Sequence, residues 1–171
     1  MADPIRIRHE TADDAEGVRA VNDAAFGQPD ESRIIDAVRA AEHVTVSLVA
    51  EEGARIVGHI LFTPMTLQPP CGTVRLVALG PMAVTPDRQR IGVGTALVRT
   101  GLAECRRAGA QAVVVIGHTA FYARFGFRPA SQFGLRSPFE VPDEVFMAAE
   151  LVPAALAGAA GQVVYVPEFG A

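Results

Sequence analysis

The sequence contains no lysine, and all fifteen of its basic residues are arginines. This absence excludes a P-loop, whose phosphate-binding motif requires a Gly-Lys-Ser/Thr step. An excess of positive charge is absent as well, because the 171 residues carry a formal net charge of −4. No charge therefore attracts the chain to nucleic acid or to an anionic membrane, and we expect neither as a partner.

Cysteines are scarce. Cys71 and Cys105 are too few for a disulfide framework and lack the spacing of metal ligands, so we expect both to be reduced and no metal to be bound. The first residues, MADPIRIRHETADDAEG, lack the basic start and apolar run of a signal peptide. No apolar run approaches the ~20 residues that a membrane helix needs. These absences predict a cytoplasmic protein.

What the sequence does contain is a regular succession of strand and helix patterns. The expected elements are a strand at 5–9, helices at 11–26 and 30–41, a hairpin at 44–67 that turns at Gly53, a buried strand at 74–86, a helix that ends near Gly109, a strand at 111–117, a short helix at 119–126 and one or two late strands. This order is typical of an α/β or α+β sheet protein. The length and the half-hydrophobic composition favour one domain over residues 1–171.

The segment TPDRQRIGVGTALV, Thr85 to Val98, places two glycines at the start of an expected helix. Glycine in a helix costs roughly 0.5–1 kcal/mol relative to alanine, so Gly92 and Gly94 need a reason. Free N–H groups and the helix dipole favour a phosphate at a helix start, and glycines let it reach the backbone. A dinucleotide fingerprint does not fit, because Leu97 stands where its third glycine would be. Close packing of the helix on a strand is the alternative explanation.

The pattern that fits is Gln/Arg-x-x-Gly-x-Gly/Ala, here Gln89 to Gly94. It resembles the pyrophosphate loop of the GNAT N-acetyltransferases, which bind acetyl-coenzyme A. The segment PMAVTPDRQRIGVGTALV is similar to the strand, loop and helix of that family. The segments VVVIGHTAFYARFGFRP and VAEEGARIVGHILFTPMTL resemble its aromatic-Tyr helix and its hairpin. Over Ile5 to about Leu151 the chain is thereby identified as a member of the family, nearest to the small bacterial N-acetyltransferases of the YhbS type.

The resemblance implies the GNAT fold, a single α/β (α+β) domain. Its central sheet is mixed, mostly antiparallel, of about six or seven strands with a splayed central strand, and about four helices flank it. The splay is expected at Gly80-Pro81, because proline removes a ladder donor. Acetyl-CoA is the implied cosubstrate, without a metal. The implied cofactor-binding residues, acting through their backbones, are Met82, Ala83 and Val84 for the pantetheine arm and thioester carbonyl, and Gln89, Arg90, Ile91, Gly92, Val93 and Gly94 for the pyrophosphate.

In this family a neutral amine attacks the thioester directly, so Cys105 need not be a nucleophile. Tyr122 occupies the tyrosine position of the family and is expected to protonate the departing thiolate. The alternative is a structural tyrosine that packs on Phe125. The strand RLVALGPMAV lacks the glutamate that some members use as a base, which leaves His118, His59 or a water chain.

The acceptor, a small-molecule or peptide amine, stays open, as does the choice between monomer and homodimer. The acids of FGQPDES and the aromatics Phe133, Phe139 and Phe146 are candidates for its pocket, with a helix start and core packing as the alternatives. Glu51 and Glu52 are expected to be solvated. The alternative function is an inactive or weakly active module that binds or senses acyl-CoA, which the missing strand acid favours. A nucleotide-binding enzyme is the third possibility, disfavoured by the missing lysine and third glycine.

Overall fold

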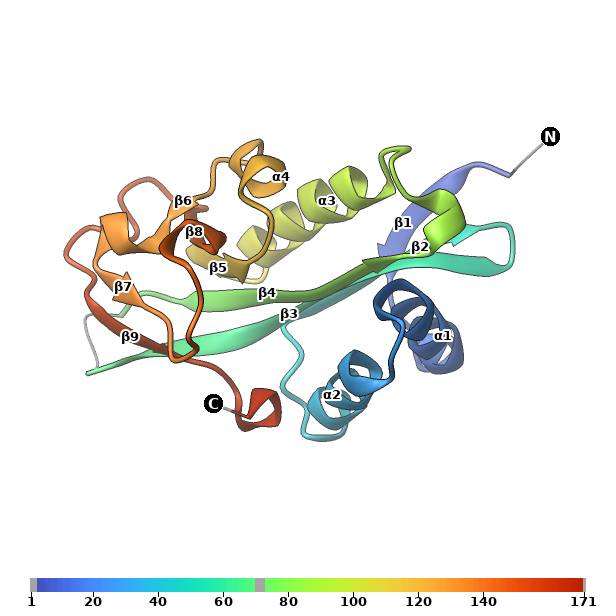
Figure 1. Cartoon of the computed structure of the whole chain (residues 1–171), viewed down its shortest axis with the longest axis horizontal. Coiled ribbons are helices and arrows are strands. Elements are labelled where there is room, and N and C mark those ends of the chain that lie inside the picture. The colour runs from blue at the N-terminus through green and yellow to red at the C-terminus, as the bar shows by residue number, and fades with distance from the viewer. Residues whose placement is uncertain (1–2, 70–72, 171) are drawn as a thin grey trace.

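The computed structural model describes residues 3–69 and 73–170, so Cys71 lies outside the described residues. Figure 1 shows a twisted sheet with α3 and α4 on one face and α1 and α2 on the other. The helices are α1 (Ala15–Phe26), α2 (Asp30–Ala40), α3 (Val93–Arg107) and α4 (Thr119–Ala123). The expected four helices are thereby confirmed.

The described strands form one mixed sheet. In spatial order they are β1 (Ile5–His9), β2 (Val46–Glu52), β3 (Arg55–Gln68), β4 (Leu76–Val84), β5 (Ala112–Ile116), β8 (Phe146–Glu150) and β6 (Arg128–Pro129), with β9 (Gly161–Val164) beside β3 and β7 (Leu135–Arg136) beside β9. Only the pairs β4–β5 and β7–β9 are parallel among the described residues, which confirms a mostly antiparallel sheet. The late part of the chain holds four strands instead of one or two, because the two-residue strands β6 and β7 are too short to show a period.

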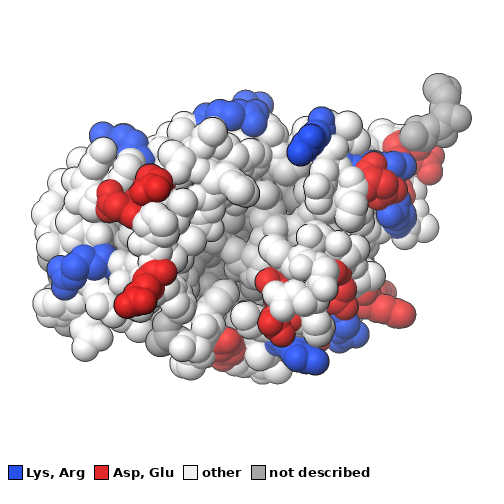
Figure 2. Space-filling model, in the orientation of Figure 1, with Lys and Arg blue, Asp and Glu red and all other residues white. Residues whose placement is uncertain are grey.

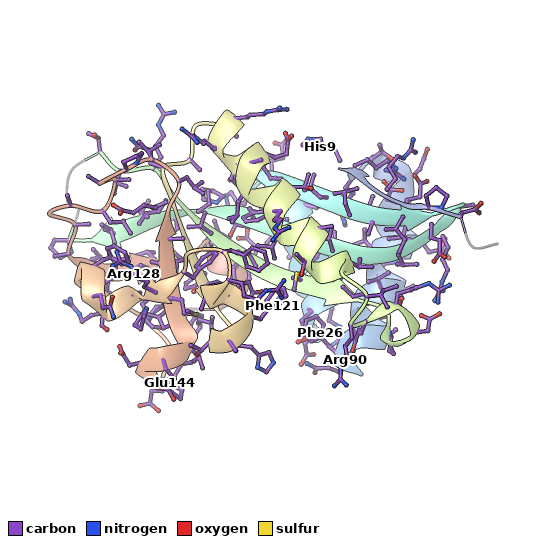
Figure 3. All side chains as sticks on the ribbon, turned by 90° about the horizontal axis from the view of Figure 1, so that it is seen from above. His9, Phe26, Arg90, Phe121, Arg128 and Glu144 are labelled. Carbon is purple, nitrogen blue, oxygen red and sulfur yellow. The ribbon has the colours of Figure 1, made fainter. Side chains whose placement is uncertain are left out.

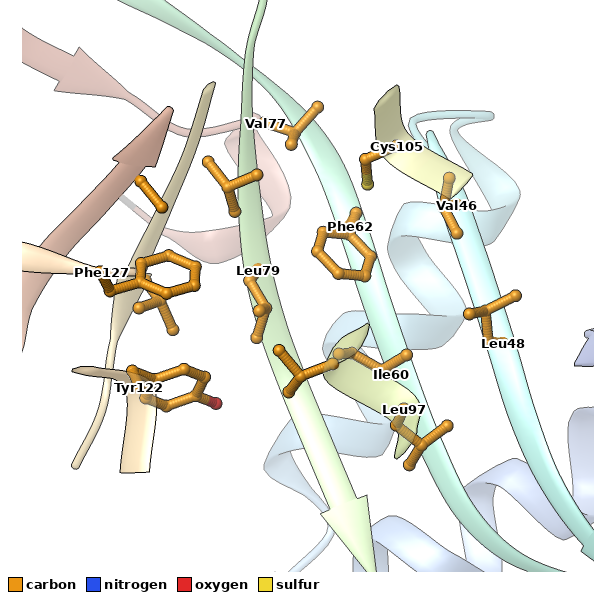
Figure 4. Packing of buried hydrophobic residues seen from close by; sticks show 14 of the residues in the cluster. Val46, Leu48, Ile60, Phe62, Val77, Leu79, Leu97, Cys105, Tyr122 and Phe127 are labelled. Atoms are coloured by element: carbon orange, nitrogen blue, oxygen red, sulfur yellow. The ribbon is translucent and has the colours of Figure 1, made fainter. Parts of the chain in front are cut away.

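Helix α3 packs on the sheet through its apolar side (Figure 4). Leu97 and Cys105 are fully buried in the same core cluster as Ile60 and Phe62 of β3. Burial raises the pKa of the Cys105 thiol to about 12. A thiol that stays protonated inside the core is a poor nucleophile, which agrees with a packing role for Cys105.

Close approach of α3 to the sheet depends on two other glycines. A Cβ atom on Gly101 of α3 would lie 2.5 Å from Phe62 Cε2. One on Gly58 of β3 would lie 2.9 Å from Leu97 Cδ1. Real Cβ atoms do not approach neighbours so closely, so close packing of α3 on the sheet requires glycine at positions 58 and 101. Helix–strand packing, which was the alternative explanation for Gly92 and Gly94, is therefore served by these two other glycines.

The start of α1 is held by a buried carboxylate. A short 3₁₀ turn at Ala12–Asp14 precedes the helix, which therefore begins four residues later than the predicted range. Arg8 Nη1 and Nη2 donate to the two oxygens of Asp14 at 2.8 and 2.9 Å, and the Thr11 backbone N–H donates to it at 2.7 Å. Mainly because of the Arg8 guanidinium, the pKa of Asp14 falls from its usual 3.8 to about 2.

We predict that Asp14→Asn lowers the free energy of unfolding by up to about 2 kcal/mol at pH 7, since one pKa unit corresponds to about 1.4 kcal/mol. A carboxylate with a lowered pKa stabilises the fold above pH ~4, and this stabilisation is lost as the pH falls toward 2. Urea unfolding at pH 7, 4 and 3 should therefore show the parent and variant converging. Asp36→Asn, which removes a carboxylate with a 37% exposed side chain, is the control and should change stability by less than about 1 kcal/mol. Equal losses at pH 7 and pH 3 would contradict the prediction.

The two glutamates at the end of β2 are not solvated, so that expectation is wrong. Glu51 accepts hydrogen bonds from Arg6 at 2.7 Å and from Arg8 at 3.1 Å, and its side chain is 18% exposed. Glu52 pairs with Arg88 at 2.7 Å. The arginines that cover these carboxylates come from β1 and from the loop after β4, which are remote in the sequence. Over the described ranges, no helix has both the length and the apolar character needed to cross a membrane.

Candidate active site

Strand β4 separates from β5 halfway along its length. Residues Leu76–Leu79 pair in parallel with Ala112–Val115, and the pairing stops there. On the other side, β3 continues to pair with Met82–Val84. Beyond Gly80-Pro81, one edge of β4 has therefore lost its neighbour, at the interruption that the sequence marks.

A cavity of about 1190 Å³, which we call the central cavity, opens where the two strands part. Figure 2 shows the hollow on this face of the molecule, between the α4 region and the α1–α2 region of Figure 1. Phe26, Arg90 and Phe121 come from three different segments and meet around it (Figure 3). Of the predicted cofactor residues, the ones that line it are Met82, Ala83, Val84, Gln89, Arg90, Gly92 and Gly94.

The other two predicted residues, Ile91 and Val93, do not line the central cavity. Ile91 is 63% exposed, and Val93 is buried in the core against the sheet. The two residues alternate with the glycines along the loop, so their side chains point elsewhere. Contact between either residue and a ligand in the cavity would have to involve its backbone.

The start of α3 carries the two glycines for different reasons. Gly92 directly precedes the first helical residue. Its φ of 97° is a backbone conformation that residues other than glycine rarely adopt. Gly94 has ordinary helical backbone, and a Cβ there would lie 3.6 Å from Met82 Cε and 3.7 Å from Phe121 Cζ. No side chain caps the helix and no acid lies in its first turn. Neither glycine is needed for packing, which leaves an uncapped helix start that faces the cavity.

Of the three consecutive polar residues Arg88, Gln89 and Arg90, the first two bind the protein itself. Arg88 donates to Glu52 at 2.7 Å, and Gln89 Nε2 donates to the Val84 carbonyl at 2.9 Å. The Val84 carbonyl therefore already accepts a hydrogen bond from the loop. Arg90 has no polar partner among the described residues. It alone of the three leaves its side chain free to contact an anion.

A second arginine lies beside the start of α3, and the sequence did not predict it there. Arg124 of the α4 segment lines the central cavity, and its Nη2 donates to Thr95 Oγ1 in the first turn of α3 at 3.3 Å. Its guanidinium also lies 5.6 Å from the Phe121 ring centre. The motif TAFYARFG contains this arginine, but only the fold brings it to a helix start 29 residues earlier in the chain.

Tyr122 lines the cavity and is buried among other rings, with 6% of its surface exposed. Its ring meets Phe121 and Phe127 edge-on at 5.0 and 5.6 Å, and the Phe121 ring in turn lies 5.2 Å from that of Phe125. Its hydroxyl has no hydrogen-bond partner among the described residues. Burial raises the pKa of this hydroxyl to about 12, which keeps it protonated at neutral pH. A Cβ on Gly117 would lie 2.4 Å from the Tyr122 ring, so that glycine makes room for it.

The two candidate histidines are in different surroundings. His118 is exposed, precedes α4 and lines the central cavity. His59 is fully buried, with Nε2 2.9 Å from Ser47 Oγ and Nδ1 3.4 Å from Asn22 Nδ2 of α1. Desolvation lowers the pKa of His59 to about 3. The expectation that His59 is a candidate base is therefore corrected, because β3 turns this side chain toward the face covered by α1.

Some of the residues predicted for the acceptor pocket line the central cavity, and others do not. Phe139 lines the cavity, whereas Phe146 is buried in the core and Phe133 lies against Arg128, 4.8 Å from its guanidinium. From the segment FGQPDES, Phe26 and Glu31 line the cavity. Sequence reasoning missed two further lining residues near the C-terminus, Tyr165 and Phe169, since no periodic pattern distinguishes them from core residues.

Comparison with known proteins agrees with this geometry. The acetyltransferase (GNAT) domain family matches residues 6–130. The chain is 37% identical over 134 residues to the uncharacterized N-acetyltransferase YjhQ of Escherichia coli K12, covering 77% of this chain and 74% of YjhQ. It is 30% identical over 164 residues to the uncharacterized N-acetyltransferase YhbS of the same strain, covering 95% and 97%.

Two solved structures are similar over almost the whole chain. The crystal structure of E. coli YhbS in complex with CoA has a TM-score of 0.92 at 30% identity, covering 100% of this chain and 96% of that one. A GNAT family acetyltransferase from Brucella melitensis in complex with acetyl-CoA has a TM-score of 0.80 at 35% identity, covering 97% and 98%. The chain belongs to the GNAT family and is a GNAT-type N-acetyltransferase.

Proposed function

We propose that this protein transfers an acetyl group from acetyl-CoA to a primary amine, by direct attack of the amine within a ternary complex. The observation that supports it best is the convergence of two backbone features on one cavity. The free edge of β4 over Met82–Val84 and the uncapped start of α3 both border it. A thioester with a pantetheine arm needs the first feature, and a pyrophosphate needs the second.

The backbone of the loop supplies the anion site. N–H groups from Gln89 to Gly94 bind the pyrophosphate, with Gly92 giving the turn and Gly94 the close approach. The Arg90 and Arg124 side chains add positive charge on the same wall of the cavity. A backbone N–H within Met82–Val84 donates to the thioester carbonyl oxygen as the carbonyl becomes tetrahedral, which stabilises the developing negative charge.

The reaction needs two proton transfers, one to the departing thiolate and one from the attacking amine. Tyr122 offers a protonated hydroxyl without a competing partner, which suits donation to the departing thiolate. Of the four histidines, all of them described, only His118 lines the cavity, so it is the imidazole candidate for the base. A water chain through the open cavity is the alternative base. Strand β4 offers no carboxylate for this purpose.

The test is a pair of measurements on the purified protein. Calorimetric titration with CoA and acetyl-CoA should show binding, and ATP should not compete. A free-thiol assay with acetyl-CoA should then show amine-dependent release of CoA for at least one acceptor class. CoA binding without thiol release over a broad amine panel would overturn the transferase proposal in favour of an acyl-CoA-binding module. Displacement of CoA by ATP would favour a nucleotide-binding enzyme.

We predict that Arg90→Ala weakens CoA binding less than tenfold, and more at low salt than at high salt. The side chain is exposed and unpartnered, where screened contacts are worth roughly 0–1 kcal/mol. Arg88→Ala is the matched control on the same loop. Because Arg88 pairs with Glu52 and does not line the cavity, we expect its loss to change affinity much less. Abolished binding in Arg90→Ala would show that side chains rather than the backbone make the site.

A further inference from the structure

One wall of the central cavity is aromatic and belongs to no part of the proposed cofactor site. Phe139, Tyr165 and Phe169, which we call the aromatic wall, all line the cavity. The Tyr165 ring centre lies 5.2 Å from that of Phe139 and 5.5 Å from that of Phe169. The wall comes from the loop after β7 and from the C-terminal segment, which lies on the side of the sheet that carries α2 (Figure 1).

The aromatic wall is tied to the segment after α2 by a side-chain contact. His43, just after α2, lies with Nδ1 3.0 Å from both oxygens of Glu168, the residue beside Phe169. This contact holds the C-terminal segment against the helix that supplies the other lining residues, Glu31 and Ile34. A wall held in this way is a preformed surface for an apolar group.

Tyr165 adds a polar group to the aromatic wall. It is 9% exposed, and its hydroxyl has no hydrogen-bond partner among the described residues. Burial raises the pKa of this hydroxyl, so it stays protonated at neutral pH. A hydroxyl that has no protein partner and opens on a cavity is free to form hydrogen bonds with a ligand or with water. Its place on the cavity wall therefore suits a bound molecule with a polar atom next to an apolar group.

Charge is divided across the cavity. Glu31, half-buried at the start of α2, is the one carboxylate among the described lining residues. Both of its oxygens accept from Gln28 Nε2, at 3.0 and 3.1 Å, which orients it without neutralising its charge. The lining arginines, Arg90 and Arg124, belong to the loop before α3 and to the α4 segment. A single carboxylate on the acceptor side matches a single ammonium group, whereas polyamines and aminoglycosides carry several.

We propose that the acceptor is a monoamine that carries one aromatic or similarly bulky apolar group, an arylalkylamine in the simplest case. The apolar group packs on Phe139, Tyr165 and Phe169, and Glu31 attracts the ammonium form as it enters. This inference rests on the proposed acetyl transfer, because it names the acceptor of that same site.

The first test compares acceptors at fixed acetyl-CoA. Phenethylamine and tyramine should give kcat/KM at least tenfold above spermidine and kanamycin in the free-thiol assay, since burial of an aromatic ring against the aromatic wall favours binding. Higher kcat/KM for spermidine or kanamycin would overturn the inference.

The second test uses variants of the aromatic wall. Phe139→Ala should raise the KM for phenethylamine about tenfold with CoA affinity unchanged, and Glu31→Gln about threefold. Phe133→Ala is the matched control, because this phenylalanine lies in the same part of the chain but does not line the cavity. If Phe139→Ala fails to fold, Tyr165→Phe keeps the packing and should still raise the KM for tyramine. Unchanged KM values in Phe139→Ala or Tyr165→Phe would contradict the inference.

A binding measurement separates this inference from the proposed activity. Phenethylamine should broaden or shift its own NMR signals with the CoA-loaded parent protein, and less so with Phe139→Ala. Binding without turnover would sink the transfer reaction while supporting the acceptor class. Turnover of other amines without phenethylamine binding would sink the acceptor class alone.

Discussion

Tyr122→Phe is expected to lower kcat about 10²-fold while leaving CoA affinity nearly constant. The substitution keeps the ring between Phe121 and Phe127 and removes only the hydroxyl. A hydroxyl that interacts with the departing thiolate acts on the way to products, so its loss reduces kcat rather than binding. General acids contribute ~10²–10⁴-fold. The low end applies because a phenol with a pKa of about 12 is a weaker acid than a thiol near ~8.5.

The stability of the same sample distinguishes a catalytic from a structural tyrosine. Because the Tyr122 hydroxyl has no partner among the described residues, its removal strands no buried group, and Tm should not fall. Tyr165→Phe is the comparison, since it deletes the hydroxyl of the other buried tyrosine of the cavity and should act on acceptor KM more than on kcat. Unchanged kcat in Tyr122→Phe on a verified acceptor would leave His118 or water as the proton donor.

Gly94→Val is expected to weaken CoA binding about 10²-fold in a protein that remains folded. The new side chain would project between Met82 and Phe121 into the central cavity and keep a pyrophosphate from the start of α3. Loss of two charge-assisted hydrogen bonds, each at the low end of ~1.5–3 kcal/mol, corresponds to that factor. Valine has a higher helix propensity than glycine and Gly94 has ordinary backbone, so Tm should not fall. Calorimetric titration with CoA and a thermal melt measure both quantities.

Gly101→Ala is the control for a glycine that serves packing. Its Cβ would collide with Phe62, so this variant should lose stability. Gly94→Ala has room for its Cβ and should be as stable as the parent or more so. A folded Gly94→Val protein that binds CoA as well as the parent would contradict the backbone site.

The features that the sequence predicts well are those that one short segment contains. The interruption at Gly80-Pro81, the glycines at 92 and 94 and the position of Tyr122 each lie inside one strand–loop–helix unit. Their chemistry depends on backbone conformation, which neighbouring residues largely determine. For the same reason, the long helices and the central strands agree with the periodicity of the chain, whereas two-residue strands do not show in it.

Only the tertiary structure decided which side chains meet. His59 follows the same alternating strand pattern as its neighbours, but the helix that covers its face buries it beside Asn22 and excludes it from the cavity. Arg124 reaches Thr95, and Tyr165 joins Phe139, through contacts between segments that lie far apart in the chain. Sequence by itself determined the family, and it also supplied the backbone site and the candidate acid that we propose, because these features are local. The charge partners and the acceptor wall required the fold, because long-range packing alone sets the surroundings of a side chain.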